Sequence, residues 1–430
     1  MRFKSIVKWG ICMAIPFVMG ACSSQDDIYD NDEPYVKSEV RLVEMSPATR
    51  ALANELEPMF VKYTNDVIKS SLEENAPHLV TSPLSATMLM GLLANGVEEN
   101  SRREITKYLG TEDIVTLNEL CATLLAGLPK ADDLVGIDIS NSLWVNKHFG
   151  LSPNKDYLSV LEKSFQGEAF NYDFAADNSL FIKDVNKWYG KNSGGLISDS
   201  NLRLDGMTTL ALLLNSVYFK APWDGEIFPA NNTKKGVFKG TVHEEMVDMM
   251  NSDTLSGRYY YKDENFDIFS LDFGNGIYAF RVVLPSEGLT LAEASELFTP
   301  ELLNKVSEEG VSCSLTISMP KFNIANNLSL NSLLRAKGVG SFADGRNMTM
   351  FDSRVDGDAT MEVRQSTVFA VDEKGAVAAS VSSGELSTTE SFMPEENGLY
   401  SIDVNRPFIF YIFEKSTGAW ITSGYVANLE

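Results

Sequence analysis

From Leu210 to Phe219 the chain is an almost unbroken run of bulky apolar residues. Such a run is typical of a strand that is buried on both faces, so it predicts a sheet with packed layers on either side. With 44% hydrophobic residues in a chain of 430, there is enough apolar material for a large core. Further strands are expected at Ile277–Leu284, Thr367–Val371, Phe408–Phe413 and Trp420–Val426.

Helices are predicted mainly in the first third of the chain. Phe60, Tyr63 and Val67 follow Pro58 at helical spacing, and Ala86–Ala94 is apolar on all sides, as in a buried helix. Helices and strands are mixed without a regular βαβ order, which favours the α+β class.

The chain is strongly acidic. It has 36 Lys and Arg against 59 Asp and Glu, a formal net charge of -23. Nucleic-acid phosphates are bound by basic surfaces, so no nucleic-acid partner is expected. Only three histidines are present, which leaves few options for histidine-based catalysis or metal binding.

The N-terminus has the pattern of an export signal. Basic residues precede an apolar run from Trp9 to Met19, which is too short to span a bilayer. The run ends in Met19-Gly20-Ala21-Cys22, which resembles a bacterial lipobox. Residues 1–21 are therefore predicted to be a lipoprotein signal peptide and Cys22 the lipidated residue. An ordinary signal peptide with a chance cysteine is the alternative.

Residues 22–44 are expected to form the lipidated start and an acidic tether. An acidic run after a lipidated cysteine resembles the surface-export signal of some Gram-negative lipoproteins. The predicted location is the bacterial cell envelope, at the outer membrane, with exposure on the cell surface as one alternative. Cys121 and Cys313 remain in the folded part, where they are free to pair, but two isolated cysteines are no disulfide framework.

Catalytic motifs in the sequence are incomplete. Ser152–Lys155 matches the S-x-x-K pattern without its partner motifs, and His243 has no second histidine four residues later. Gly338–Gly340 mimics a dinucleotide loop but ends a predicted helix. We therefore expect no enzyme activity, no metal and no cofactor. The remaining acidic cluster fits no EF-hand spacing and consists of Asp352, Asp356, Asp358 and Glu362.

One segment near the C-terminus breaks the pattern of strands. From Gly375 to Gly398 the chain has hardly a bulky residue, although good strands are predicted before and after it. A long structureless stretch inside a compact chain is usually functional or disordered. The chemistry of this protein is therefore expected in this segment.

Nine segments, in order along the chain, resemble the serpins. The most recognisable is Asn215–Lys220, followed by Trp223 and Phe228. The resemblance covers roughly residues 45–429. It implies a single domain over 45–430 with three β-sheets, eight or nine helices and an exposed reactive-centre loop at about 375–398. The other eight segments are Ser82–Ser85, Asn141–Val145, Val185–Trp188, Val283–Pro285, Met319–Phe322, Asp372–Gly375, Arg406–Phe408 and Gly424–Val426.

The resemblance implies a monomeric inhibitor of serine proteases, with papain-like cysteine proteases as a second partner class. The partner's catalytic triad attacks the loop as if it were substrate and forms an acyl-enzyme. The cut loop then inserts as a new strand of the central sheet and distorts the trapped protease. A non-inhibitory binding or carrier protein of the same fold is the alternative.

The residues of the loop permit such an insertion. No proline occurs between Gly375 and Met393, and proline is excluded from central strands. If Ala376 faces inward, every second residue to Thr388 does so too, and all of these are uncharged. Glu390 is the first charge in that register, and burying it unpaired would cost several kcal/mol. The predicted hinge consists of Glu373, Gly375, Ala376, Ala378, Ala379 and Ser380.

The family places the attacked bond about sixteen residues beyond the hinge glutamate, which points to Thr389–Glu390. Thr388 is the second choice for the residue before the attacked bond. Phe392 is a third candidate, because the loop is longer than usual. A threonine before the bond suits proteases with small apolar pockets, such as elastase-like enzymes. Trypsin-like enzymes are expected to be poor targets.

Five positions resemble the region in which the sheet of a serpin opens. They are Ser82, Ser85, Asn215, Trp223 and Gln365. The family usually has a histidine at the position of Gln365, bonded to the asparagine. An amide also donates and accepts, so the network is expected to persist with an altered opening energy.

Overall fold

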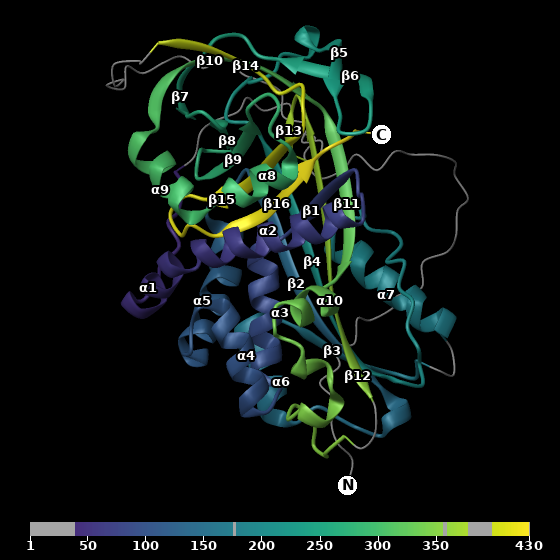
Figure 1. Cartoon of the computed structure of the whole chain (residues 1–430). Helices are drawn as coiled ribbons and strands as arrows, with labels where there is room; N and C mark the ends of the chain where they lie inside the picture. The colour runs from purple at the N-terminus through teal and green to yellow at the C-terminus, as the bar shows by residue number, and fades with distance from the viewer. Residues whose placement is uncertain (1–38, 175–177, 356–358, 377–397, 430) are drawn as a thin grey trace, which may run out of the picture.

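Helices surround two twisted sheets in the computed structural model, which describes residues 39–174, 178–355, 359–376 and 398–429 (Figure 1). This confirms the α+β class and the serpin-like architecture. The α-helices are α1 (Pro47–Glu55), α2 (Glu57–Glu73), α3 (Pro83–Asn95), α4 (Glu99–Leu109), α5 (Ile114–Gly127), α6 (Lys155–Phe165), α7 (Asn178–Asn192), α8 (Leu291–Leu297), α9 (Pro300–Glu309) and α10 (Asn331–Ala336). Only Leu56 separates α1 from α2. If these two are counted as one interrupted helix, the described residues contain nine α-helices, which agrees with the eight or nine expected.

The strands lie mostly in the second half of the chain. They are β1 (His78–Thr81), β2 (Gly136–Asn146), β3 (Glu168–Tyr172), β4 (Thr209–Pro222), β5 (Lys234–Lys239), β6 (Glu244–Asn251), β7 (Leu255–Lys262), β8 (Phe266–Phe273), β9 (Tyr278–Pro285), β10 (Val311–Pro320), β11 (Phe322–Ser329), β12 (Thr360–Asp372), β13 (Gly375–Ala376), β14 (Leu399–Asp403), β15 (Phe408–Glu414) and β16 (Trp420–Val426).

The apolar run that predicts a doubly buried strand forms β4. Its leucines alternate between two hydrophobic clusters: Leu213 packs in the main core, whereas Leu212 and Leu214 pack with Trp144 and Phe181 of the cluster that includes α7. Figure 1 shows α7 on one side of the long strands and α3 on the other. The sheet is therefore covered on both faces, as its sequence requires.

The smaller sheet has six strands in the order β11-β12-β13-β4-β2-β3, and β12 also pairs directly with β4. The described strands form two hydrogen-bonded sheets rather than three separate ones, because β10 connects two parts of the larger sheet. Val311–Leu315 of β10 pairs with β7, and Ser318–Pro320 pairs with β6. β14 runs parallel to β10, which brings the first strand after the reactive-loop segment to this sheet.

Two smaller expectations concern the cysteines and the membrane. Cys121 on α5 and Cys313 on β10 are buried thiols that form no disulfide. Burial raises the pKa of the Cys121 thiol to about 12, so it is protonated and unreactive at neutral pH. In the part of the chain that the structure describes, no helix has the length and apolarity needed to cross a bilayer. Cys22 and the segment before it lie outside the described residues.

Candidate functional site: the hinge between β12 and β4

The start of the reactive-loop segment already lies inside the smaller sheet. Ala376 of β13 is opposite Val371 of β12 on one side and Ala221 of β4 on the other, and both pairings are antiparallel. Ala376 is fully buried and belongs to the main core. The chain turns back from β12 through Glu373 and Lys374, so β13 forms a wedge at one end of the β12–β4 seam.

The turn requires a glycine at position 375. Its φ is +139°, which side chains of L-residues rarely adopt, and a Cβ there would lie 2.1 Å from the carbonyl oxygen of Ala221. The predicted hinge glycine therefore has a physical function, because only this residue lets β13 approach β4 so closely.

Glu373 is anchored by residues from two distant segments. Its Oε1 accepts a hydrogen bond from Thr233 Oγ1 at 2.6 Å and lies 2.6 Å from Lys321 Nζ. Burial alone would raise the pKa of the Glu373 carboxyl, but the hydrogen bonds from Lys321 and Thr233 outweigh burial and lower this pKa below its usual value. Glu373 is therefore ionised at neutral pH and fixes the position of the turn.

Trp223 holds the other side of the same turn. Its indole Nε1 donates to the carbonyl oxygen of Asp372 at 3.0 Å, and its backbone N–H donates to that of Lys374 at 3.1 Å. The indole stacks on Phe273 with a centroid distance of 4.5 Å. Trp223, predicted as part of the opening region, thus contacts the hinge directly.

Beyond the wedge the seam is closed. β12 and β4 pair in parallel over eight positions, from Thr367 opposite Val217 to Thr360 opposite Thr209. A strand that entered between them would have to break each of these pairings. The pairings have one irregularity, next to Thr360.

Gln365 lies in the middle of this seam, directly opposite Asn215. Its Oε1 accepts hydrogen bonds from Thr81 Oγ1 at 2.6 Å and from the backbone N–H of Ser82 at 3.0 Å, and its Nε2 donates to the carbonyl oxygen of Ser82 at 2.8 Å. Gln365 therefore ties β12 to β1 and to the N-cap of α3. The expected polar network exists, but the amide of Gln365 is directed to Ser82 and not to Asn215.

Several buried polar groups along the seam have no hydrogen-bond partner among the described residues. Asn215 Nδ2 donates to Asn141 Oδ1 at 3.1 Å, but Asn215 Oδ1, Ser85 Oγ and Thr367 Oγ1 are buried and unpaired. An unpaired buried polar group costs about 1–3 kcal/mol. These groups therefore destabilise the closed seam.

The sequence did not indicate the partners of these residues. Lys321, Thr233, Thr81 and Asn141 come from separate parts of the chain, and no local pattern reveals such pairings. Of the predicted site residues, the structure places Glu373, Gly375, Ala376 and the five residues of the opening region. The remaining predicted hinge and bond residues lie outside the described residues: Ala378, Ala379, Ser380, Thr388, Thr389, Glu390 and Phe392.

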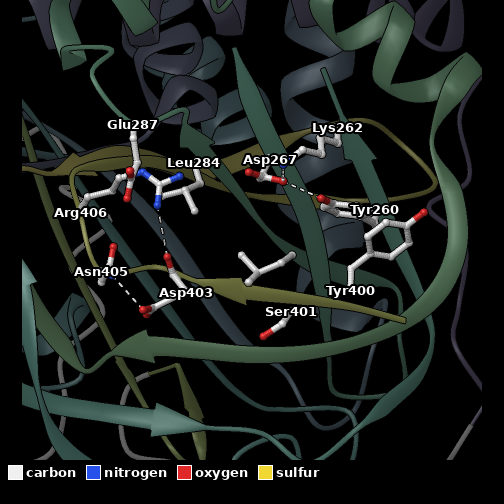
Figure 2. A pocket seen from close by; sticks show the side chains of 11 residues that line it. Tyr260, Lys262, Asp267, Leu284, Glu287, Tyr400, Ser401, Asp403, Asn405 and Arg406 are labelled. Atoms are coloured by element: carbon white, nitrogen blue, oxygen red, sulfur yellow. Dashed lines mark hydrogen bonds and ion pairs between the residues drawn. The ribbon is translucent and has the colours of Figure 1, made fainter. Parts of the chain in front are cut away.

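A pocket of about 480 Å³ lies beside β14, the first strand after the loop segment (Figure 2). Its charged and polar side chains mostly bond to one another. Asp267 accepts from Tyr260 Oη at 2.5 Å and from Lys262 Nζ at 2.8 Å, and Asn405 Nδ2 donates to Asp403 Oδ2 at 2.8 Å. Arg406 donates to the carbonyl oxygens of its neighbours. The polar lining of this pocket is therefore largely paired within the protein.

A family model described as serpin (serine protease inhibitor) matches residues 61–429. The chain belongs to the serpin family. Similar proteins include Serpin-Z10 of Arabidopsis thaliana, 28% identical over 86% of this chain and 95% of the relative. Another is Iripin-3 of Ixodes ricinus, 26% identical over 84% of this chain and 91% of the relative.

Solved structures show the same fold. The thermophilic serpin tengpin in its native state matches with a TM-score of 0.76 and 23% identity, over 91% of this chain and 97% of tengpin. A complex of thyroxine-binding globulin with thyroxine matches with a TM-score of 0.74 and 21% identity, over 87% and 99% of the two chains. Serpins of this fold thus include a carrier as well as inhibitors, and the fold alone does not separate the two activities.

Proposed function

We propose that this serpin inhibits a serine protease by inserting its cleaved loop between β12 and β4. The observation that supports this most is β13, which already pairs with both strands at one end of the seam. Cleavage would free the rest of the loop to continue in the same direction. The new strand would be antiparallel to both neighbours.

The pairing of β13 fixes the register of the proposed strand. Because Ala376 faces Val371 and Ala221, position 378 would face Phe369 and Phe219, which are both fully buried. Position 377 would instead point to the face of Ala370 and Lys220, which are half-buried. Even-numbered positions therefore enter the main core, and the loop supplies small or uncharged residues for them.

The same register predicts where insertion would end. The first residue of β12, Thr360, would face position 387, and the first residue of β4, Thr209, would face position 388. Glu390 would remain outside the paired region. This supports Thr389–Glu390 as the attacked bond, with Thr388 as the residue before the alternative bond.

The free energy released by insertion is large enough to distort a protease. Two new ladders would replace the single one of eight positions. A net gain of roughly 14 backbone hydrogen bonds at about 1 kcal/mol each gives on the order of 10 kcal/mol. A typical protease domain has a total stability of about 5–15 kcal/mol, so the two quantities are comparable.

The proposed target is an elastase-like serine protease, because Thr389 before the bond suits a small apolar specificity pocket. A papain-like cysteine protease is the second proposed class of partner. Trapping also requires small residues in the hinge, and Ala376, Ala378 and Ala379 meet this requirement. A carrier protein has no such requirement on its loop.

The test compares two arginine substitutions in adjacent loop positions. Ala378→Arg would place a charge between Phe369 and Phe219, so incubation with pancreatic elastase should give a cleaved serpin and no SDS-stable adduct. Val377→Arg, the matched control, points to the half-buried face and should still form the adduct. Equal adduct formation by both variants would refute the register, and cleavage of the wild type without any adduct would favour the non-inhibitory alternative.

We also propose that Cys22 carries a lipid that anchors the inhibitor at the outer membrane, within reach of external proteases. The support is the lipobox-like Met19–Cys22 and the acidic run after it. In a Gram-negative host, Cys22→Ser should move the protein from the membrane fraction to a soluble fraction. Retention of the variant in the membrane would contradict lipid anchoring at this residue.

A further inference from the structure

The outer face of α7 carries a row of lysines. Lys183, Lys187 and Lys191 are spaced four residues apart, so they occupy successive turns on one face of the helix, over about 12 Å. All three side chains are exposed, and Figure 1 shows α7 at the periphery of the molecule. The whole chain has a net charge of -23. The outer face of α7 therefore has a local charge opposite to that of the molecule.

The acids around α7 do not neutralise this row. Three acids on α7 or in contact with it each accept a hydrogen bond from a neutral side chain. The pairs are Asp184 with Tyr172, Glu168 with Trp188, and Asp199 with Asn186. None of the three lysines forms an ion pair with a residue that the structure describes. The positive charge of the row is thus directed to solvent without an acidic partner.

Exposed leucines lie at both ends of the row. Leu180, in the first turn of α7, is 50% exposed, and Leu196, just after the helix, is 42% exposed. Leu180 lies three residues before Lys183 and therefore on the same face. A soluble polyanion would bind the lysines but would leave the leucines in water. A membrane surface offers phosphates to the lysines and an apolar boundary to the leucines.

We propose that the lysine row of α7 docks this protein on an anionic phospholipid surface. The inference rests on the anchoring proposed at Cys22, because residues 22–38 span at most about 60 Å and keep the folded part near the bilayer. At this short range a contact too weak to hold a free chain is sufficient, since the tether supplies a high local concentration. The bilayer attracts the face of α7 and repels much of this acidic molecule, which selects one orientation.

The test couples the chain from residue 22 onward to a maleimide lipid through Cys22, so it does not depend on lipidation in a cell. Cys121 and Cys313 are buried and should not react. The vesicles contain phosphatidylcholine and phosphatidylglycerol, with a trace of a lipid whose headgroup is photoactivatable and labels the residues that touch the surface. Mass spectrometry of the digested protein should find the label concentrated on residues 180–196.

A triple variant removes the charge of the row: Lys183→Gln, Lys187→Gln and Lys191→Gln. Its labelling of residues 180–196 should fall at least about tenfold, because each lysine near an anionic surface contributes about fivefold in affinity. The matched control changes three exposed lysines of other helices and should label like the wild type: Lys107→Gln, Lys163→Gln and Lys305→Gln. Equal thermal midpoints of the two variants would show that both are folded. Salt at about 1 M, which shortens the Debye length to about 3 Å, should act like the first variant.

Label that is spread evenly over the chain would overturn the proposal. Label on residues 180–196 that persists in the α7 variant, or on vesicles of phosphatidylcholine alone, would also overturn it. Heparin that removes this label at a charge concentration below that of the anionic lipid would assign the face to a soluble polyanion, and the membrane assignment would be wrong. The anchoring itself is tested by the fractionation of Cys22→Ser, so a failure of docking leaves the anchoring untouched.

Discussion

Gly375 determines how closely the loop approaches β4. In Gly375→Ala the new Cβ would collide with the carbonyl oxygen of Ala221, so β13 should leave the seam. The backbone amide of Ala376 should then exchange its hydrogen at least about tenfold faster, as measured by mass spectrometry on the intact protein. Gly338→Ala is the control, because Gly338 also has a positive φ but no atom near its Cβ position. Unchanged exchange at Ala376 would show that the close approach is unimportant.

The ion pair of Glu373 predicts a pH dependence of stability. Because its pKa is lowered in the folded chain, the carboxylate stabilises the fold at all pH values above about 4.5, and this contribution is lost as the pH falls through the lowered pKa. Glu373→Gln removes charged hydrogen bonds worth about 1–2 kcal/mol, so its thermal midpoint at pH 7 should be about 1–2 °C below that of the wild type.

The two midpoints should converge in calorimetric scans as the pH is lowered toward 3. Glu287→Gln, which removes an exposed pair with Lys239 at 3.8 Å, should follow the wild type throughout. A midpoint difference for Glu373→Gln that persists at low pH would contradict the assignment to its ionised form.

At the scale of elements, function depends on which pair of strands separates. A disulfide between β12 and β4 should block insertion, and Ser366 and Ser216 are directly opposite each other in that seam. The oxidised variant Ser366→Cys with Ser216→Cys should be cleaved by the protease without forming an adduct. Reduction of the disulfide should restore the adduct, which is measured on denaturing gels.

A matched cross-link shares one of these cysteines. Ser140 of β2 is also opposite Ser216, on the other side of β4, where no separation is proposed. The oxidised variant Ser140→Cys with Ser216→Cys should therefore trap the protease as the wild type does. Loss of trapping in both oxidised variants would mean that general rigidity, and not the β12–β4 seam, limits insertion.

The sequence predicted the elements whose burial is visible in their composition. The run Leu210–Phe219 and the helix around Ala86–Ala94 are almost entirely apolar because both are covered on all sides, and they form β4 and α3. β5 and β14 were not predicted, since most of their side chains are exposed and polar residues interrupt any apolar pattern. β8 and β10 were not predicted either, although most of their residues are buried. The wedge β13 was also not predictable, because two residues carry no periodicity and their pairing depends on strands from distant segments.

For the whole molecule, the proposed mechanism requires that the intact form is not the most stable arrangement of the chain. The unpaired polar groups of Asn215, Ser85 and Thr367 and the short wedge β13 fit a seam that remains ready to open. The nine sequence segments predicted the family correctly, but they gave no information about this balance of energies. That balance arises from long-range pairing, which only the folded structure reveals.

The most direct test is the thermal midpoint of the serpin before and after a single cut in its loop, measured by calorimetry on the otherwise complete chain. If the cut loop becomes a strand between β12 and β4, a gain on the order of 10 kcal/mol should raise the midpoint by about 10 °C or more. If the cut protein melts at or below the temperature of the intact protein, the loop does not insert and the proposed mechanism is wrong.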